Sequence, residues 1–268
     1  NKTDAILTIT DGSTAKGGSI SMTRTLASAL YTAVVHNGEL NLTGGRIYVE
    51  QNQNDGVWRT STPLYLVNSD NAKLTMTGGT LEAKAKYCTF GLYTYGIANI
   101  SGGTVKAVST NQGTAVGVYA IDRTTTISGT ATIDVSGTKS STGAQVTGWV
   151  SNDGQTRHNG TLNITGGSVN VTADQSGVCG FQVYAVTKTV DGTVYGAHGI
   201  LNISGGTTNV TCKTTTATQI FGVQCQESRV LDSETPHHIL GREKGIANIS
   251  GGTFTVDTRN NGAWVANS

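Results

Sequence analysis

The sequence predicts an all-β chain that folds as a three-sided β-solenoid of about seven to eight rungs. A short phrase of alternating apolar and polar residues followed by two glycines, as in Leu162–Gly167 (LNITGG), recurs along the 268 residues. Such self-similarity is typical of chains built from stacked units rather than around one irregular core. The copies begin at Leu40, Leu74, Ala98, Leu162, Leu201 and Ala247, with an expected first copy at Ala5 and a degenerate copy at Thr125.

Each unit is predicted to begin with two short strands, one on either side of the glycine pair. In the copy at Leu162, period-two alternation puts Leu162 and Ile164 inward on the first strand, and Val169 and Val171 inward on the second. The glycines form the turn, because glycine adopts turn conformations without steric cost. Equivalent positions predict one stacked inward column of Leu42, Ile100, Ile164, Ile203 and Ile249.

A third strand in each unit is predicted from a small, apolar phrase. The shortest interval between glycine pairs, from Gly78 to Gly102, is 24 residues, which suits a coil with three sides. No interval contains an amphipathic helical pattern, and the absence of hairpin signals between units favours parallel pairing. The phrase begins at Phe90, Val116, Phe181 and Phe221, and segments at Leu64 and Ala263 are placed in the same slot.

Repeats along the whole chain predict a single solenoid domain over residues 1–268. The degenerate copy is one residue out of step, so Ile133 and Val135 are expected to point inward in the strand that follows it. Three longer intervals predict insertions at one shared corner, near residues 151–160, 187–199 and 226–245.

The composition argues against two classes of partner. Charged residues make up 13% of the chain and the formal net charge is +1, so no basic field for nucleic acid is expected. No apolar run approaches the roughly 18 residues of a membrane span.

The four cysteines lack metal or redox spacing. They are expected to be buried free thiols, with a Cys212–Cys225 disulfide as the alternative.

The repeated phrase [LA]-N-[IL]-[ST]-G-G-T-[VF] resembles the right-handed parallel β-helices of bacterial surface proteins and adhesins, which share a pectin-lyase-like architecture. The resemblance covers nearly the whole chain. It implies a right-handed parallel β-helix located outside the cell or on its surface. It does not imply one activity, because this architecture serves lyases, glycosidases, tailspikes, adhesins and passive stalks.

A polysaccharide-acting enzyme is the first alternative. Glu82 and Asp134 are predicted to lie two rungs apart on one outward column. Their carboxyl groups would be ~9–10 Å apart, which is the upper end of the separation found in inverting glycosidases. Lys106 lies between them, so a surface ladder of alternating charge is the better interpretation. The sequence shows no acidic partners that would make His198 catalytic. The pair His237–His238 lacks a third metal ligand at a known spacing. No catalytic residue, cofactor or metal is therefore expected.

Ice binding is a further, weaker alternative. It rests on outward threonine pairs such as Thr8/Thr10 and Thr75/Thr77, but asparagine and serine replace threonine in most units. Stacked asparagine and threonine side chains that hydrogen-bond along the rod fit better. The same asparagines create N-x-[ST] sequons, which a repeat of this composition generates by itself.

The favoured expectation is an extracellular structural or adhesive solenoid, either a stalk segment or a subunit of a head-to-tail fibre. Its expected partners are another copy or an adjoining solenoid, together with a carbohydrate or a host-surface ligand. The residues assigned to end-to-end assembly are Ile6, Leu7, Ile9, Trp264 and Val265. The residues assigned to a ligand or partner loop are Arg229, Asp232, Glu234, His237, His238 and Arg242.

Overall fold

The computed structural model describes residues 5–11, 18–24, 30–52, 60–175, 177–214, 219–231 and 239–257. All regular elements in these ranges are β-strands, as the sequence predicts. No described segment therefore forms a long apolar helix of the kind that crosses a membrane.

Most strands belong to three parallel sheets, which together we call the body. Sheet A contains β1 (Ile6–Ile9), β4 (Glu39–Leu42), β7 (Lys73–Met76), β10 (Ile97–Ile100), β13 (Thr124–Ile127), β18 (Gly160–Ile164), the end of β21 (Thr193–Ile203) and β26 (Ile246–Ile249). Sheet B contains β2 (Ser19–Arg24), β5 (Arg46–Gln51), β8 (Thr80–Ala85), β11 (Thr104–Ser109), β14 (Thr132–Gly137), β19 (Ser168–Ala173), β22 (Thr207–Cys212) and β27 (Thr253–Asp257). Sheet C contains β3 (Leu30–His36), β6 (Thr60–Leu66), β9 (Cys88–Thr94), β12 (Thr114–Ile121), β15 (Ser140–Thr147), the start of β20 (Val178–Val190) and β23 (Ile220–Cys225).

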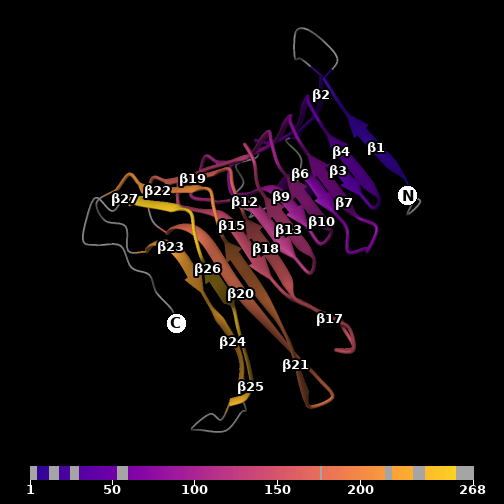
Figure 1. Cartoon of the computed structure of the whole chain (residues 1–268), viewed down its shortest axis with the longest axis vertical. Coiled ribbons are helices and arrows are strands. Elements are labelled where there is room, and N and C mark those ends of the chain that lie inside the picture. The colour runs from indigo at the N-terminus through magenta and orange to yellow at the C-terminus, as the bar shows by residue number, and fades with distance from the viewer. Residues whose placement is uncertain are drawn as a thin grey trace.

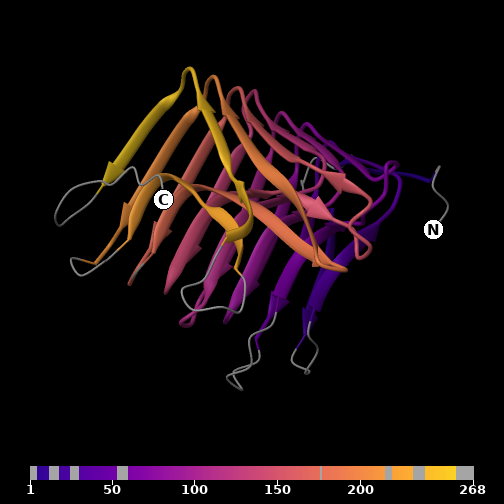
Figure 2. The ribbon, with the colours of Figure 1, turned by 90° about the horizontal axis from the view of Figure 1, so that it is seen from below.

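Neighbouring strands within each sheet come from successive repeats of the sequence. Figures 1 and 2 show the consequence: the colour changes steadily from indigo to yellow along the body, strand by strand. Parallel pairing needs a crossover between partners, and here the other two sheets supply it. The arrangement is consistent with a β-solenoid.

The interior follows the predicted alternation. Leu162 and Ile164 are 0% and 2% exposed, and Val169 and Val171 are equally buried. Burial of such side chains contributes roughly 1.5–3 kcal/mol each. The prediction for the degenerate copy is also confirmed. Its shift places Ile133 and Val135 inside.

One member of the predicted inward column does not behave as expected. Ile249 pairs in register with Ile203, but its side chain is 53% exposed, whereas Leu42, Ile100 and Ile203 are buried. The reason is its position in β26, the last described strand of sheet A, which pairs only with β21 on one side. The register is therefore correct, and the burial prediction is wrong at this end.

The glycine pairs turn the chain from sheet A to sheet B. The second glycine of each pair has a positive φ, for example +78° at Gly103 and +85° at Gly206. A Cβ atom disfavours this left-handed region, which explains why glycine recurs there. In the degenerate copy, Gly129 takes the same role with φ 56°.

The register of sheet C corrects the predicted third strand. Phe90 and Val116 align with Thr142, Cys179 and Phe221, so the phrase beginning at Phe181 was placed two residues out of register. The phrase at Leu64 has the same error, because Tyr65 pairs with Tyr93 and Leu64 is therefore level with Leu92. Phe181 instead aligns with Ala144 and is fully buried. Ala263, placed in the same slot, lies outside the described residues.

The correct alignment reveals a second glycine column that the sequence analysis missed. A Cβ atom at Gly143 would lie 2.5 Å from Gly180 O and 2.5 Å from Val169 Cγ1 of sheet B. Such distances are shorter than van der Waals contact, so glycine lets sheet C approach sheet B closely. The column contains Gly91, Gly117, Gly143, Gly180 and Gly222.

All four cysteines are unbonded, so the alternative Cys212–Cys225 disulfide is not formed. Cys179 and Cys212 are buried, and Cys88 and Cys225 are partly exposed. Burial raises the pKa of the Cys179 thiol to about 12 and also raises that of Cys225. These thiols are therefore protonated at neutral pH and pack as small hydrophobic groups.

Candidate functional site

The outer face of sheet C carries one column of large, uncharged side chains. Because side chains alternate along a strand, the residue after each buried Leu64 or Leu92 points outward. Parallel register then stacks one outward residue per strand. The column is Tyr65, Tyr93, Tyr119, Gln145, Gln182 and Gln224, on β6, β9, β12, β15, β20 and β23.

The first half of this column is aromatic. The Tyr93 ring lies 5.3 Å from Tyr65 and 5.0 Å from Tyr119, measured between ring centroids. Phe90 stacks on Tyr119 at 5.5 Å and meets Tyr93 edge-on at 5.2 Å, and Tyr95 extends the cluster. These separations and tilts are those that aromatic pairs prefer. Burial raises the pKa of Tyr65, Tyr93 and Tyr119, so all three phenols stay neutral below alkaline pH.

The second half of the column is a ladder of amides. Gln145 Nε2 donates to Gln182 Oε1 at 2.5 Å, and Gln182 Nε2 donates to Gln224 Oε1 at 3.1 Å. Thr142 Oγ1 also donates to Gln182 Oε1, at 3.2 Å. Beside the ladder lies a hollow of about 280 Å³, lined by the three glutamines together with Thr114, Ser140, Thr142, Gly177, Val178, Cys179, Tyr184, Gln219 and Phe221.

This face has no formal charge along its length. The strands β6, β9, β12, β15 and β23, and residues 178–184 of β20, contain no Asp, Glu, Lys or Arg. We call the six-residue column, with Phe90 and the hollow beside the glutamines, the aromatic–amide face. It offers flat apolar rings at one end and paired hydrogen-bond donors and acceptors at the other.

Three antiparallel strand pairs project from the corner between sheets C and A, and we call them the wing (Figure 1). All three fall in the insertions that the sequence places at one corner. They are β16 (Trp149–Val150) with β17 (Arg157–His158), Ala185–Val190 of β20 with Thr193–His198 of β21, and β24 (Glu227–Leu231) with β25 (Ile239–Lys244).

The strand pairs of the wing bind one another. Lys188 Nζ donates to Asn152 Oδ1 at 2.6 Å, and the His198 backbone N–H donates to Asn159 Oδ1 at 2.8 Å. On the other side, the hydroxyl groups of Thr187 and Ser228 lie 2.7 Å apart. The wing is therefore a stacked unit rather than three separate loops.

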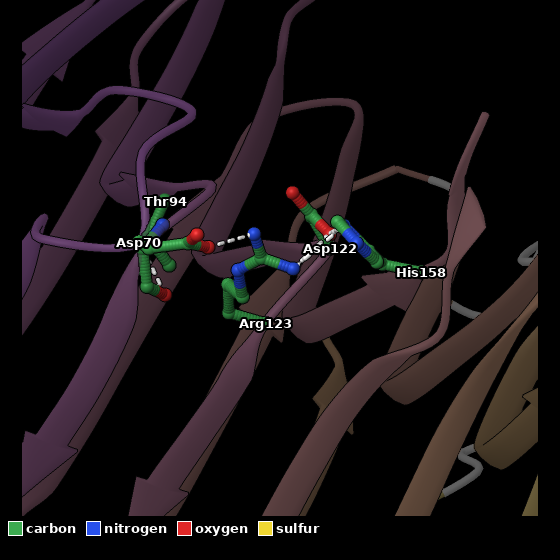
Figure 3. Close-up of polar contacts among 6 residues, drawn as sticks. Asp70, Thr94, Asp122, Arg123 and His158 are labelled. Carbon is green, nitrogen blue, oxygen red and sulfur yellow. Dashed lines mark hydrogen bonds and ion pairs between the residues drawn. The ribbon is translucent and has the colours of Figure 1, made fainter. Parts of the chain in front are cut away.

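A charged cluster ties the same corner together across several strands (Figure 3). Arg123 follows β12, and its Nη2 pairs with Asp70, which follows β6. Nη1 of Arg123 lies 3.2 Å from Asp122 Oδ1. His158 Nδ1 from the wing lies 2.6 Å from the same Asp122 oxygen, and its ring stacks near Trp149. Asp122 is buried with φ 75°, and burial raises the pKa of its carboxyl group despite the nearby Arg123 guanidinium.

The carboxylates considered for catalysis lie on sheet B, not on the aromatic–amide face. Lys106 is in register with Glu82 on one side and Asp134 on the other, as predicted. Glu82 is engaged by Arg46 at 2.7 Å and by Lys106 at 3.9 Å. This alternation of acidic and basic side chains is the surface charge ladder that the sequence analysis preferred to a catalytic carboxylate pair. His198 lies in the wing, where its Nδ1 is 3.2 Å from Glu243, so the expectation that it lacks an acidic partner is wrong. Glu243 comes from β25, 45 residues further along the chain, and the antiparallel strand pairs of the wing bring the two together.

The residues assigned to a partner loop are only partly placed. Arg229 and Arg242 are cross-strand neighbours in the wing, and both contact Glu227. Asp232, Glu234, His237 and His238 lie outside the described residues, as do Trp264 and Val265. Across the described ranges, no group of three His, Cys, Asp or Glu side chains is arranged to hold a metal ion.

The remaining assembly residues, Ile6, Leu7 and Ile9, form β1 at the edge of sheet A. Ile6 is 68% exposed, whereas Leu7 and Ile9 pack partly against the core.

Along sheet A the predicted asparagine ladder is present: Asn202 donates to Asn163 and Asn248 donates to Asn202, both at 2.9 Å.

Sequence reasoning missed the aromatic–amide face, although a signal was present. The phrases FGLYT, VGVYA and FGVQC carry tyrosine or glutamine at their fourth position. Correct alignment of TGAQV and CGFQV with these phrases completes the column.

Comparison of the chain with known protein families, curated proteins and solved structures finds no match.

Proposed function

We propose that this chain is a structural and adhesive β-solenoid that acts outside the cell and holds a ligand on the aromatic–amide face without cleaving it. The observation that carries the proposal is the uncharged column of three rings and three amides on sheet C. Partly exposed rings and amides arranged at a fixed repeat suit recognition of an extended surface.

The proposed path of the chain is a right-handed parallel β-helix with three sides and seven to eight rungs in one domain. Support comes from the parallel pairing in all three sheets and from the strong preference of parallel crossovers for the right-handed sense. This is the architecture that the repeated phrase resembles in bacterial surface proteins.

The proposal excludes catalysis because the aromatic–amide face lacks acidic side chains on its strands. Glu82 is held in ion pairs on sheet B, and Asp122 is buried in the corner cluster. A glycosidase needs two carboxyl groups that flank the bond to be cleaved. The aromatic–amide face contributes none from its strands.

End-to-end contact with further solenoid is the structural part of the proposal. Ile6 on edge strand β1 is 68% exposed, and Ile249 on edge strand β26 is 53% exposed. Edge strands with exposed apolar side chains are suited to pairing with another strand. The proposed partner is another copy in a head-to-tail array, or an adjoining solenoid of a longer chain.

Binding of labelled protein to microbial and host cell surfaces tests the adhesive function. We expect saturable binding that falls strongly in a Tyr93→Ala/Tyr119→Ala double variant and persists in Tyr48→Ala, a matched tyrosine on sheet B. Circular dichroism establishes that each variant is folded. Equal binding by all three proteins, or by none, contradicts the proposal.

Product assays test the absence of catalysis. Reducing-end and unsaturated-product signals from plant, mucin and microbial polysaccharides should stay at background. An activity that Glu82→Gln or Asp134→Asn abolishes would show that sheet B is an active site and would overturn this part of the proposal.

A further inference from the structure

We infer that the aromatic–amide face binds a neutral polysaccharide chain that runs along the body, across the strands of sheet C. The inference rests on the proposed function, because it names the ligand of the same face. It differs from that function in committing to one chemical class and to one direction of the ligand.

The aromatic half of the face suits the apolar side of sugar rings. Sugars carry C–H groups on their ring faces, and these pack on exposed aromatic rings. Tyr65, Tyr93 and Tyr119 lie on consecutive strands, which repeat every ~4.8 Å along the body. A polymer that crosses the strands therefore meets an aromatic ring on each of three consecutive strands.

The amide half suits sugar hydroxyl groups. A hydroxyl group both donates and accepts hydrogen bonds, and so does the primary amide of glutamine. The ladder uses one N–H of Gln145 and one of Gln182, and each amide has a second N–H. Thr142 and Tyr184 also line the hollow of about 280 Å³ beside these amides. The hollow has the volume and the polar lining for one or two sugar units.

The absence of charge selects a neutral polymer. Uronate or sulfate groups bind best to arginine or lysine, and no strand segment of this face carries either. An acidic polymer here would lose hydration without gaining a counter-charge. The order of rings followed by amides also makes the two ends of the face different, so the ligand should bind in one orientation.

Affinity electrophoresis and calorimetry with soluble polymers provide the test. The probes are neutral β-glucan, mannan, galactan and xylan, compared with polygalacturonate and heparan sulfate at the same ionic strength. We expect at least one neutral polymer to bind. Tyr119→Ala and Gln182→Ala should each weaken that binding about tenfold, while Tyr119→Phe should change it less than about threefold.

Tyr48→Ala on sheet B is the matched control and should bind like the unmodified protein. Gln182→Ala keeps the test valid if Tyr119→Ala fails to fold, because it alters only the amide ladder. Preference for an acidic polymer, no binding to any neutral polymer, or equal binding by the face variants overturns the inference.

One outcome separates this inference from the proposed function. Cell-surface binding that requires Tyr93 and Tyr119 but survives enzymatic removal of surface glycans would leave the adhesive function standing. It would show that the face recognises another ligand, and the polysaccharide inference would be wrong.

Discussion

The outer faces of sheets B and C are built from the same stacked repeats, yet they carry opposite chemistry. Sheet B presents ion pairs such as Lys84–Glu50 at 3.2 Å beside the Arg46–Glu82–Lys106 ladder. Sheet C presents rings and amides and no formal charge in its central strands. The inward residues must fill one shared core, whereas each outward column can vary independently. Function in such a molecule is therefore expected on one face, not throughout.

The two sheets also differ on the inside. Sheet B strands such as β11 and β14 alternate strictly between buried and partly exposed residues. In β12 and β15 four consecutive residues are buried, and the glycine column lies in this run. Sheet C thus contacts the interior with its backbone as well as with its side chains. Substitutions at four sites, each with a matched control, test this comparison in order of decreasing expected effect.

The glycine column should be the most sensitive feature. Gly143→Ala would place a methyl group 2.5 Å from the Gly180 carbonyl oxygen and from Val169 Cγ1, and backbone atoms relax poorly. We expect a loss of about 3 kcal/mol or more in the free energy of unfolding, measured by chemical denaturation. Gly222→Ala is the control, because its nearest neighbours would lie at 3.5 and 3.6 Å. An equal loss in both variants would argue against a close backbone approach in sheet C.

Matched tyrosines on the two faces should come next. Tyr119→Ala removes ring contacts with Phe90 and Tyr93, so we expect a loss of about 2–3 kcal/mol. Tyr48→Ala removes a contact with the Arg46 guanidinium, 3.9 Å above its ring, and a hydrogen bond with Glu50, and should cost about 1 kcal/mol. If thermal or denaturant unfolding shows the reverse order, the aromatic cluster is not a packed unit.

Asp122 tests the corner that joins sheet C to sheet A. Asp122→Ala should cost about 1–2 kcal/mol, since alanine tolerates φ 75° poorly, whereas Asp122→Asn keeps a residue suited to that conformation. Burial raises the pKa of Asp122 above 3.8, so the folded state holds the proton more tightly than the unfolded state. The stability contributed by this group is present below pH 3.8 and falls as the pH rises.

Unfolding measured at several pH values therefore distinguishes these Asp122 variants. Relative to the unmodified protein, Asp122→Asn should gain stability as the pH rises from 3.8 toward neutrality. A constant difference over that range would contradict the proposed burial of an ionised carboxylate. Asp122→Ala should remain the less stable variant at every pH.

The smallest effect is expected from the sheet B ladder. A hydrogen bond from Tyr48, assisted by Lys84, lowers the pKa of Glu50 below 4.5. Its contribution is present above pH 4.5 and is lost as the pH falls through the lowered value. Glu50→Gln should cost less than about 1 kcal/mol at neutral pH and nothing in strong acid. Gln145→Ala on sheet C should show no such pH dependence.

Much of the body could be predicted because its signals are local. Alternation along a strand places Leu162, Ile164, Val169 and Val171 inside, whatever their neighbours are. The one-residue shift at Ile133 and Val135 was visible for the same reason. The corner insertions were visible as added length between repeats. Ile249 shows the limit, since burial at the end of a stack depends on what covers it.

The sequence by itself therefore determined the repeat, the inward positions and the glycine turns, because each depends on a few adjacent residues. Only the tertiary structure decided the register of sheet C. Its strands contain runs of consecutive buried residues instead of strict alternation, and they lack the glycine pair that marks register elsewhere, so Phe181 was misplaced. The tertiary structure also decided the corner cluster: Arg123 meets partners 53 and 35 residues away, Asp70 and His158. Contacts between residues so far apart exist only once the stacked strands bring their corners together.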